Sequence, residues 1–107
     1  MKKVGRFCLY NDGGFDVKLQ FVYYDENGHR HHVDGTGAYP VLQTECRSPG
    51  DSGVPNGAGM SLYAFVVWGV DNTASEMLVY DQTSSVTAYY KITGTTLQND
   101  LVLDRVE

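Results

Sequence analysis

The sequence contains no apolar run long enough to cross a membrane as a helix. The longest such run, residues 60–70, falls well short of the roughly 20 residues that a membrane-spanning helix requires. Basic residues are also scarce, because eight Lys and Arg stand against thirteen Asp and Glu and leave a net charge of −5. Nucleic acids and anionic lipids are bound through clustered basic residues. We therefore expect no nucleic-acid partner, whereas a neutral or zwitterionic membrane surface remains allowed.

Cysteine is equally rare, and Cys8 and Cys46 are the only two. The first residues carry the basic charges of a signal peptide, but Arg6 interrupts the apolar segment that should follow, and polar residues 11–14 come next. We therefore expect no signal peptide and a location in the cytoplasm or outside the cell by a non-classical route. In that setting two buried thiols are favoured over a disulfide, although the spacing of the two residues leaves both open.

Helical periodicity is absent as well, because no segment repeats apolar residues every 3.6 positions between capping residues. Short stretches of alternating apolar and polar residues are separated by Gly, Asn, Asp and Ser, most clearly around residues 15–24. Turn signals about every 8–12 residues are typical of a β-sandwich or a closed barrel. We predict a single domain, residues 1–107, folded as an all-β antiparallel sandwich of about seven to eight short strands. The expected strands cover residues 4–10, 15–24, 29–34, 39–46, 60–70, 76–80, 86–92 and 97–106.

Residues 60–70 carry the only tryptophan, Trp68, and are apolar on both faces of an extended strand. Aromatic and β-branched residues within this segment favour a strand over a buried helix. A strand that is apolar on both faces is covered by other elements on both sides. We therefore predict that residues 60–70 form the central strand and that Trp68 packs inside the fold.

Three short motifs resemble known sites, and each also reads as a turn or a hydrated strand. Residues 50–55 echo the serine nucleophile loop of chymotrypsin-like proteases, but Val54 replaces a glycine and no histidine has the flanking pattern of that family. His29 and His31 share one face of an extended strand and are weak candidates for a metal site. Residues 71–76 resemble half of a calcium motif. We expect no catalytic residues, no metal and no cofactor, and hence a protein that is not an enzyme.

Tyrosine is in clear excess, with eight among 107 residues. The adjacent pairs at residues 23–24 and 89–90 must each direct one ring to the solvent side of a strand, because successive side chains point to opposite faces. Exposed phenol rings suit choline head groups, sugar faces and membrane interfaces. The long loop of residues 47–59, rich in Gly, Pro and Ser, is a second candidate for recognition.

The order of several features resembles the aegerolysins, and more broadly the actinoporin and fungal fruit-body lectin group of β-sandwiches. The matching features are Asp-Val-Lys-Leu at 16–19, a hairpin Asp-Glu-Asn-Gly at 25–28, Cys-Arg-Ser before a Gly-rich loop at 46–59, an apolar strand, and Tyr-Asp beside a Thr- and Ser-rich segment at 80–85. The resemblance implies recognition of sphingolipid-type head groups in membranes, often beside a larger pore-forming partner. It maps the aromatic cluster of such a site onto Tyr80, Tyr89 and Tyr90, next to the loop 47–59.

We therefore predict a non-enzymatic binding module that recognises a membrane-lipid head group through peripheral contact with the membrane. Two alternatives stay open on the same residues: a glycan-binding lectin, and a structural protein that forms a homo-oligomer or joins a larger protein partner. The predicted ligand-binding residues are Tyr80, Tyr89, Tyr90, Arg47 and Asp51.

Overall fold

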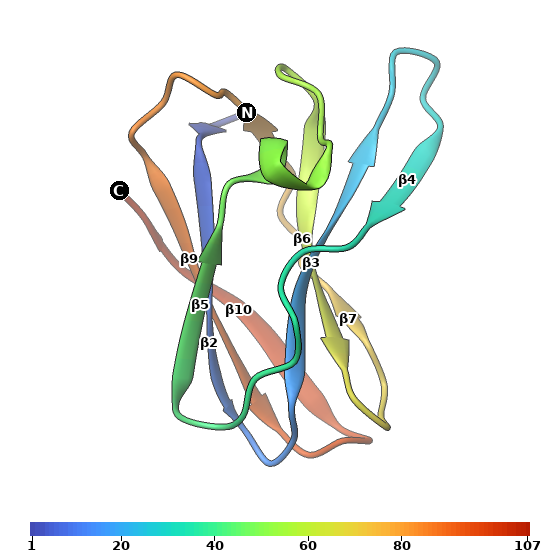
Figure 1. Ribbon diagram of the computed structural model, residues 1–107, viewed down its shortest axis with the longest axis vertical. Helices are drawn as coiled ribbons and strands as arrows, with labels where there is room; N and C mark the ends of the chain where they lie inside the picture. Colours follow the sequence, from blue (N-terminus) through green and yellow to red (C-terminus); the bar gives the residue numbers. More distant parts are fainter.

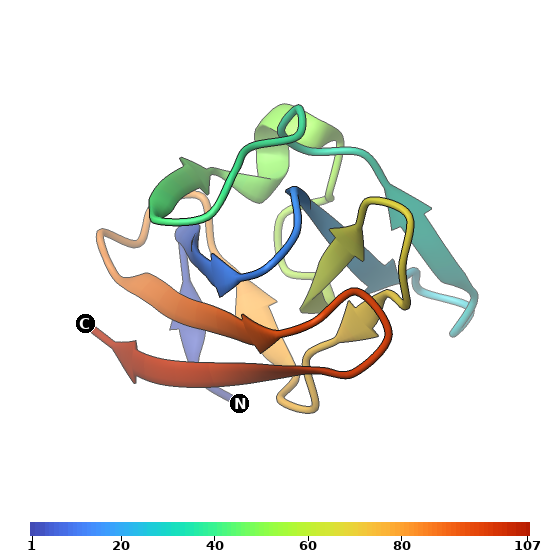
Figure 2. The same cartoon turned by 90° about the horizontal axis from the view of Figure 1, so that it is seen from below.

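The computed structural model describes residues 1–107 and consists of two β-sheets packed face to face (Figure 1 and Figure 2). One short 3-10 turn, η1 (Pro49–Ser52), is the only helical element. None of the structure's helical segments has the length and apolar character that crossing a bilayer requires. The strands are β1 (Lys3–Val4), β2 (Arg6–Gly13), β3 (Val17–Tyr24), β4 (Arg30–Val33), β5 (Gln43–Arg47), β6 (Gly59–Val66), β7 (Asn72–Thr73), β8 (Leu78–Tyr80), β9 (Thr87–Gly94) and β10 (Asn99–Val106).

The larger sheet has the order β1-β8-β6-β3-β4 with β7 beside β6, and the smaller sheet has the order β10-β9-β2-β5. This arrangement confirms the predicted all-β sandwich. Both sheets are mixed and not purely antiparallel as predicted, because β2 runs parallel to β9 and β1 runs parallel to β8. A tight turn in a sequence predicts that the strands on its two sides pair antiparallel. Parallel pairing between strands that are distant in the chain has no local sequence signal.

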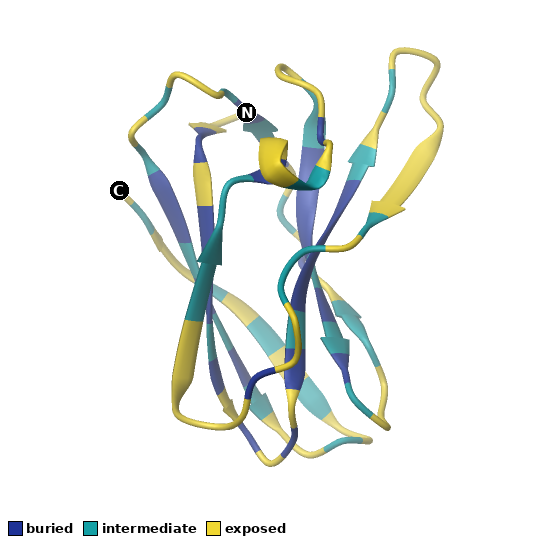
Figure 3. Ribbon diagram, in the orientation of Figure 1, coloured by how far each residue is buried: buried dark blue, intermediate teal, exposed yellow.

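The core lies between the sheets and is formed by alternate residues of the central strands (Figure 3). In β3, Val17, Leu19 and Phe21 are fully buried, as the alternation around residues 15–24 predicts. One hydrophobic cluster is shared by both layers, so the two sheets stabilise each other. The facing core residues are Phe7 and Leu9 of β2, Met60, Leu62 and Ala64 of β6, and Ala88, Tyr90 and Ile92 of β9.

The predicted central strand is confirmed for β6 and wrong beyond it. β6 ends at Val66, and the chain then turns so that the amide of Gly69 donates to the carbonyl of Val66 at 3.1 Å. Trp68 is 95% exposed and Val70 is 53% exposed, instead of buried. The strand ends here because the Asp71 carboxylate accepts a hydrogen bond from the Val66 amide at 2.9 Å, so that the following residues form a loop.

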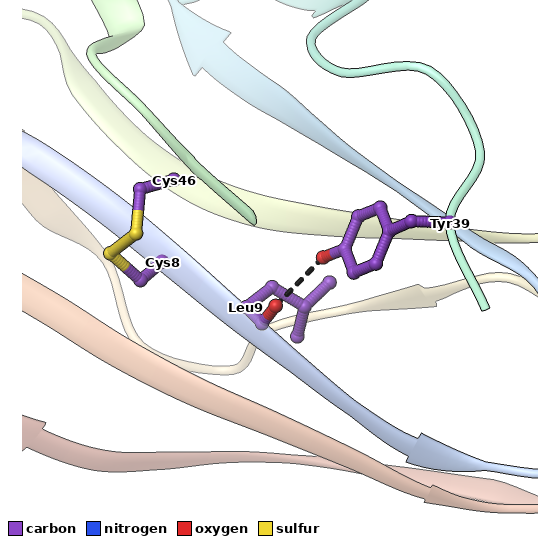
Figure 4. The surroundings of a disulfide bond; sticks show 4 residues. All are labelled: Cys8, Leu9, Tyr39 and Cys46. Atoms are coloured by element: carbon purple, nitrogen blue, oxygen red, sulfur yellow. Dashed lines mark hydrogen bonds between the residues drawn. A yellow bond between two sulfur atoms is a disulfide. The ribbon is translucent and has the colours of Figure 1, made fainter. Parts of the chain in front are cut away.

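Cys8 and Cys46 form a disulfide, which corrects the prediction of two free buried thiols (Figure 4). The two residues lie directly opposite each other on β2 and β5, with Cα atoms 4.0 Å apart. Because β5 is an edge strand that pairs only with β2, the bond fastens this edge to the sheet. The prediction of free thiols rested on the expected location of the protein. It took no account of strand register, which places the two cysteines opposite each other and cannot be read from the sequence.

Buried polar groups tie the segment before β5 to the core. The Asn11 side-chain amide donates to the carbonyl of Phe15 at 2.7 Å and to that of Tyr39 at 3.2 Å, and its oxygen accepts from the amide of Gly13 at 3.0 Å. The Tyr39 hydroxyl donates to the carbonyl of Leu9 at 2.7 Å (Figure 4). These bonds satisfy groups whose burial would otherwise be costly.

The Tyr90 hydroxyl is buried without a hydrogen-bond partner, and burial raises the pKa of Tyr90 above its ordinary value. Tyr90→Phe is therefore expected to raise the free energy of unfolding by about 1 kcal/mol, because an unsatisfied buried hydroxyl is removed. Tyr39→Phe, which loses the bond to Leu9, is expected to lower it by about 1–2 kcal/mol. Urea denaturation of both variants checks this contrast. An equal decrease in the free energy of unfolding of both variants would contradict this expectation. It would indicate that the Tyr90 hydroxyl has a hydrogen-bond partner, such as a buried water.

Candidate functional site: an apolar end of the sandwich

Exposed apolar side chains gather at one end of the molecule. Of the nine large apolar side chains that are exposed, five lie on the β4–β5, β6–β7 and β9–β10 loops, which share the lower end in Figure 1 (see also Figure 3). Single exposed apolar residues are ordinary on a soluble protein, but a gathering of them marks an interaction surface. We call this surface the apolar end, and its members are Val41 (46% exposed), Leu42 (73%), Trp68 (95%), Val70 (53%) and Leu97 (75%).

The loops that carry Trp68 and Leu97 are in direct contact. The amide of Val70 donates to the carbonyl of Thr96 at 2.7 Å. Gly69 lies so close to the same backbone that a Cβ atom there would collide with the Thr96 carbonyl oxygen, so this approach requires glycine. Two loops that are distant in the chain therefore bring Trp68 and Leu97 to neighbouring positions.

Asn99 and Asn72 lock this contact. The Asn99 side-chain amide donates to the carbonyl of Val70 at 2.9 Å, and the Asn72 amide donates to the side-chain oxygen of Asn99 at 2.9 Å. Asn72 belongs to the larger sheet and Asn99 to the smaller one, so the bonds cross from one layer to the other. The two loops form one platform and are not free to move as separate hairpins.

The backbone at the apolar end is strained at two exposed apolar residues. Leu42 and Trp68, with φ of 70° and 59°, are the only non-glycine residues with positive φ. This region disfavours side chains with a Cβ and is ordinarily occupied by Gly, Asn or Asp. Strained residues of this kind are held in place by the structure around them and cluster at functional sites. Both strained residues are large, apolar and exposed, which points to a use for them outside the fold.

Asp71 supports the base of the Trp68 loop. One carboxylate oxygen holds the amide of Val66, and the other accepts the Tyr63 hydroxyl at 2.6 Å. Burial, together with the bond to Asp71, raises the pKa of Tyr63 to about 12. The Tyr63 hydroxyl therefore stays protonated and keeps donating to Asp71 across the neutral pH range. In the segment 71–76, Asp71 is used in these hydrogen bonds, and Asn72–Thr73 form β7, which pairs with β6.

Aspartates flank the apolar end. Asp12 of β2 and Asp100 of β10 both pair with Thr93 of β9, one row above the β9–β10 loop, and both are exposed. Asp16 is exposed as well, and its carbonyl accepts the amide of Val67 beside the Trp68 loop. Three aspartates therefore border the apolar end, against one lysine, Lys18 of β3, which lies over the Phe65 ring on the larger sheet.

The predicted tyrosine cluster is not assembled on the surface. Tyr80 and Tyr90 are only 5% and 2% exposed, which corrects their placement among surface residues. Each falls on the core-facing side of its strand. Of the three predicted tyrosines, only Tyr89 faces outward. It lies on the smaller sheet, where the Arg105 guanidinium is 4.0 Å from the centre of its ring.

The predicted loop residues Arg47 and Asp51 belong to a folded turn around η1. The Arg47 guanidinium donates to the Ser52 hydroxyl at 2.6 Å and to the backbone carbonyl of Asp51 at 2.8 Å. The Tyr80 ring packs under Gly50 of the same turn. Arg47, Asp51 and Tyr80 are therefore brought together, but away from Tyr89 and from the apolar end, and Ser52 is engaged by an arginine and not by a histidine.

His29 and His31 act as partners of Asp25 in the β3–β4 hairpin. A ring nitrogen of His31 lies 2.8 Å from the Asp25 carboxylate and one of His29 lies 3.7 Å from it. The hydrogen bond from His31, aided by backbone amides, holds the pKa of Asp25 below its usual value. The His31 ring also stacks on Tyr23 with centroids 4.8 Å apart. No group of three or more His, Cys, Asp or Glu residues is arranged to hold a metal ion.

Trp68 and Leu97 were missed because the apolar run looked continuous. A signal was present, since Trp68 is followed by Gly69 and then by Asp71-Asn72, a turn-forming pair. The strand ends four residues earlier than predicted, at Val66, which places Trp68 in the turn that follows. Leu97 sits in a short Thr- and Gly-rich stretch whose partner loop no sequence pattern identifies.

Comparison with known proteins establishes a fold and not a family. No family model and no curated protein matches the sequence. Listeriolysin O is similar in structure, with a TM-score of 0.53 at 17% identity over 96% of this chain and 22% of that one. A disulfide-locked intermedilysin, solved with human CD59, has a TM-score of 0.53 at 13% identity, over 96% of this chain and 24% of that one. The cytotoxin suilysin from Streptococcus suis has a TM-score of 0.51 at 14% identity, over 96% of this chain and 23% of that one.

This chain spans less than a quarter of the length of each of these proteins and shares its fold with one part of them. The prediction of a β-sandwich is confirmed, and the fold is shared with a part of these proteins. The three neighbours are not aegerolysins, so the narrower resemblance has no counterpart among them.

Proposed function

We propose that this chain is a membrane-binding module that docks on a lipid surface through its apolar end and acts by binding, without catalysis. The observation that carries the proposal is the 95% exposure of Trp68 beside Leu97, on two loops locked to each other. A tryptophan ring is stabilised at a membrane interface because its apolar body leaves water while its N–H remains hydrated. The three loops share one end of the sandwich, so their apolar side chains can meet one flat surface together.

The strained backbone supports this use of the loops. Leu42 and Trp68 keep large apolar side chains at positions where glycine would be more stable. Among the proteins of similar fold, suilysin is described as a cytotoxin. Because this chain covers less than a quarter of that protein at 14% identity, the likeness supplies only the fold, and the proposal rests on the apolar end.

The lipid surface favoured by this geometry is uncharged overall. Asp12, Asp16 and Asp100 border the apolar end and would be repelled by anionic head groups. Zwitterionic head groups, including the choline-bearing head groups of sphingolipids, carry no net charge and meet no such repulsion. Binding is therefore expected to weaken when anionic lipid is added at low salt and to recover partly at high salt, where charges are screened.

The single tryptophan makes the proposal directly testable. Trp68 is exposed to water in the free protein, so its fluorescence is expected to shift to shorter wavelength and to lose accessibility to iodide when vesicles are added. The vesicles are phosphatidylcholine, sphingomyelin, phosphatidylcholine with phosphatidylserine, and total lipid extracted from cell membranes. An unchanged spectrum and no co-sedimentation with any of the four would overturn the proposal. The homo-oligomeric alternative stays a prediction, which light scattering of the purified chain checks.

A further inference from the structure

The end of the sandwich opposite the apolar end contains an open cleft of about 650 Å³. Its walls are the turn of the β3–β4 hairpin, residues 24–27, and the segment before β6, residues 55–59, both at the top of Figure 1. Tyr24 and Gly59 form the last pair between β3 and β6, and beyond this pair the two chains part. The cleft therefore follows from the point at which the sheet ends.

Both walls are held in place by hydrogen bonds. On the hairpin wall, the Asp25 carboxylate accepts from the amides of Asn27 and His29, each at 2.9 Å. On the other wall, the Asn56 side-chain oxygen accepts the amide of Gln82 at 2.8 Å. The cleft is thus formed before any ligand arrives, which reduces the entropy cost of binding.

The groups left free in the cleft are polar, with one aromatic ring. Tyr24 is 37% exposed, and its hydroxyl, the Glu26 carboxylate and the side-chain amide of Asn27 have no hydrogen-bond partner within the chain. The amide nitrogen of Asn56 is free as well, because only its oxygen is used. The lining has too little apolar surface for a lipid tail but offers an aromatic face, a charged acceptor and planar amides.

We propose that this cleft binds a neutral saccharide. Tyr24 would stack on the C–H face of a sugar ring, while Glu26 and the amides of Asn27 and Asn56 would bind adjacent hydroxyl groups. The volume suits a ligand of one or two sugar units. Asp25 and Glu26 repel anionic ligands, so sialylated and sulfated sugars are rejected.

The position of the cleft bears on the origin of the sugar. The molecule is 35 Å along its longest axis, and the cleft and the apolar end lie at opposite ends of that axis. A module docked through its apolar end holds the cleft away from the membrane, beyond the head groups. A glycan carried by a protein, or a free oligosaccharide, reaches it there. The inference goes beyond the proposed function and does not depend on it.

The test is a printed panel of neutral, sialylated and sulfated oligosaccharides, followed by titration calorimetry with the neutral compound that is retained best. Glu26→Gln and Tyr24→Ala are expected to weaken binding at least about tenfold, since each removes a charge-assisted hydrogen bond or a stacking contact. Tyr24→Phe keeps the ring and Glu107→Gln changes an exposed carboxylate outside the cleft, so both should bind nearly as the parent protein does.

Amide chemical shifts measured with the same saccharide should change at residues 24–27 and 55–59. No retention of any neutral saccharide, preference for sialylated compounds, shifts elsewhere, or full binding by both Glu26→Gln and Tyr24→Ala would each overturn the inference. Vesicle binding by Glu26→Gln is expected to be unchanged. Loss of saccharide binding is thereby distinguished from failure of membrane docking, which depends on Trp68.

Discussion

Replacing Trp68 with alanine is expected to lower the affinity for phosphatidylcholine vesicles about sixtyfold while leaving the fold intact. If about half of the ring's roughly 200 Å² enters the interface, at about 25 cal/mol per Å², the lost stabilisation is roughly 2.5 kcal/mol. The ring is 95% exposed in the free protein, so its removal takes little packing away. Quantitative vesicle co-sedimentation of parent and variant measures the change.

Two comparisons make this result specific to the apolar end. Leu97→Ala should also weaken vesicle binding, by about tenfold, whereas Met77→Ala removes a comparable exposed side chain elsewhere and should leave it unchanged. Trp68→Gly should abolish most binding yet raise the free energy of unfolding by about 1 kcal/mol, because glycine relieves the positive φ. A variant that becomes more stable as it stops binding cannot owe its defect to misfolding. Equal binding by Trp68→Ala and the parent protein would remove the proposed role of this residue.

Removing the disulfide is expected to have the largest effect on stability. Cys8 and Cys46 are separated by 38 positions, and a cross-link across such a loop stabilises a fold by about 3 to 4 kcal/mol in the chain-entropy model. The variant with both residues changed to alanine should therefore unfold at a temperature lower by roughly 15 °C. Thermal unfolding followed by circular dichroism provides the measurement.

Reductant supplies the matched control for this prediction. It should destabilise the parent protein by nearly the same amount and leave the double-alanine variant unaffected. Thiol labelling of the denatured, unreduced protein should find no free cysteine. Full labelling, or a parent protein indifferent to reductant, would show that the pair stays reduced in solution and would restore the earlier expectation of two free thiols.

The strands were predictable where one face is buried and the other is wet. β3 alternates strictly, and its core residues Val17, Leu19 and Phe21 could be assigned from the sequence alone. The same reasoning failed for residues 67–70, because the apolar run looks continuous although Gly69 and the Asp71-Asn72 pair indicate a turn. Parallel pairing of β2 with β9 was also out of reach, since strand order is set by contacts across the whole core.

The site was less predictable than the fold. The tyrosines drew attention through their number, yet Tyr80 and Tyr90 supply core volume, and alternation alone could not say which ring of an adjacent pair faces inward. The loops that carry Trp68 and Leu97 touch only because Gly69 allows their backbones to approach, and this contact is visible only in the tertiary structure. A binding surface made from several loops has no linear motif, so exposure in three dimensions was needed to find it.

The parallel pairing of β2 with β9 also constrains how the protein is made. Cys8 lies beside Tyr89, so the smaller sheet cannot close until most of the chain has left the ribosome. Until then, β2 has an open edge and an apolar face without cover, a state prone to aggregation. Such distant contacts are typical of slow folders, so β2 stays uncovered for longer than a strand that pairs within a hairpin.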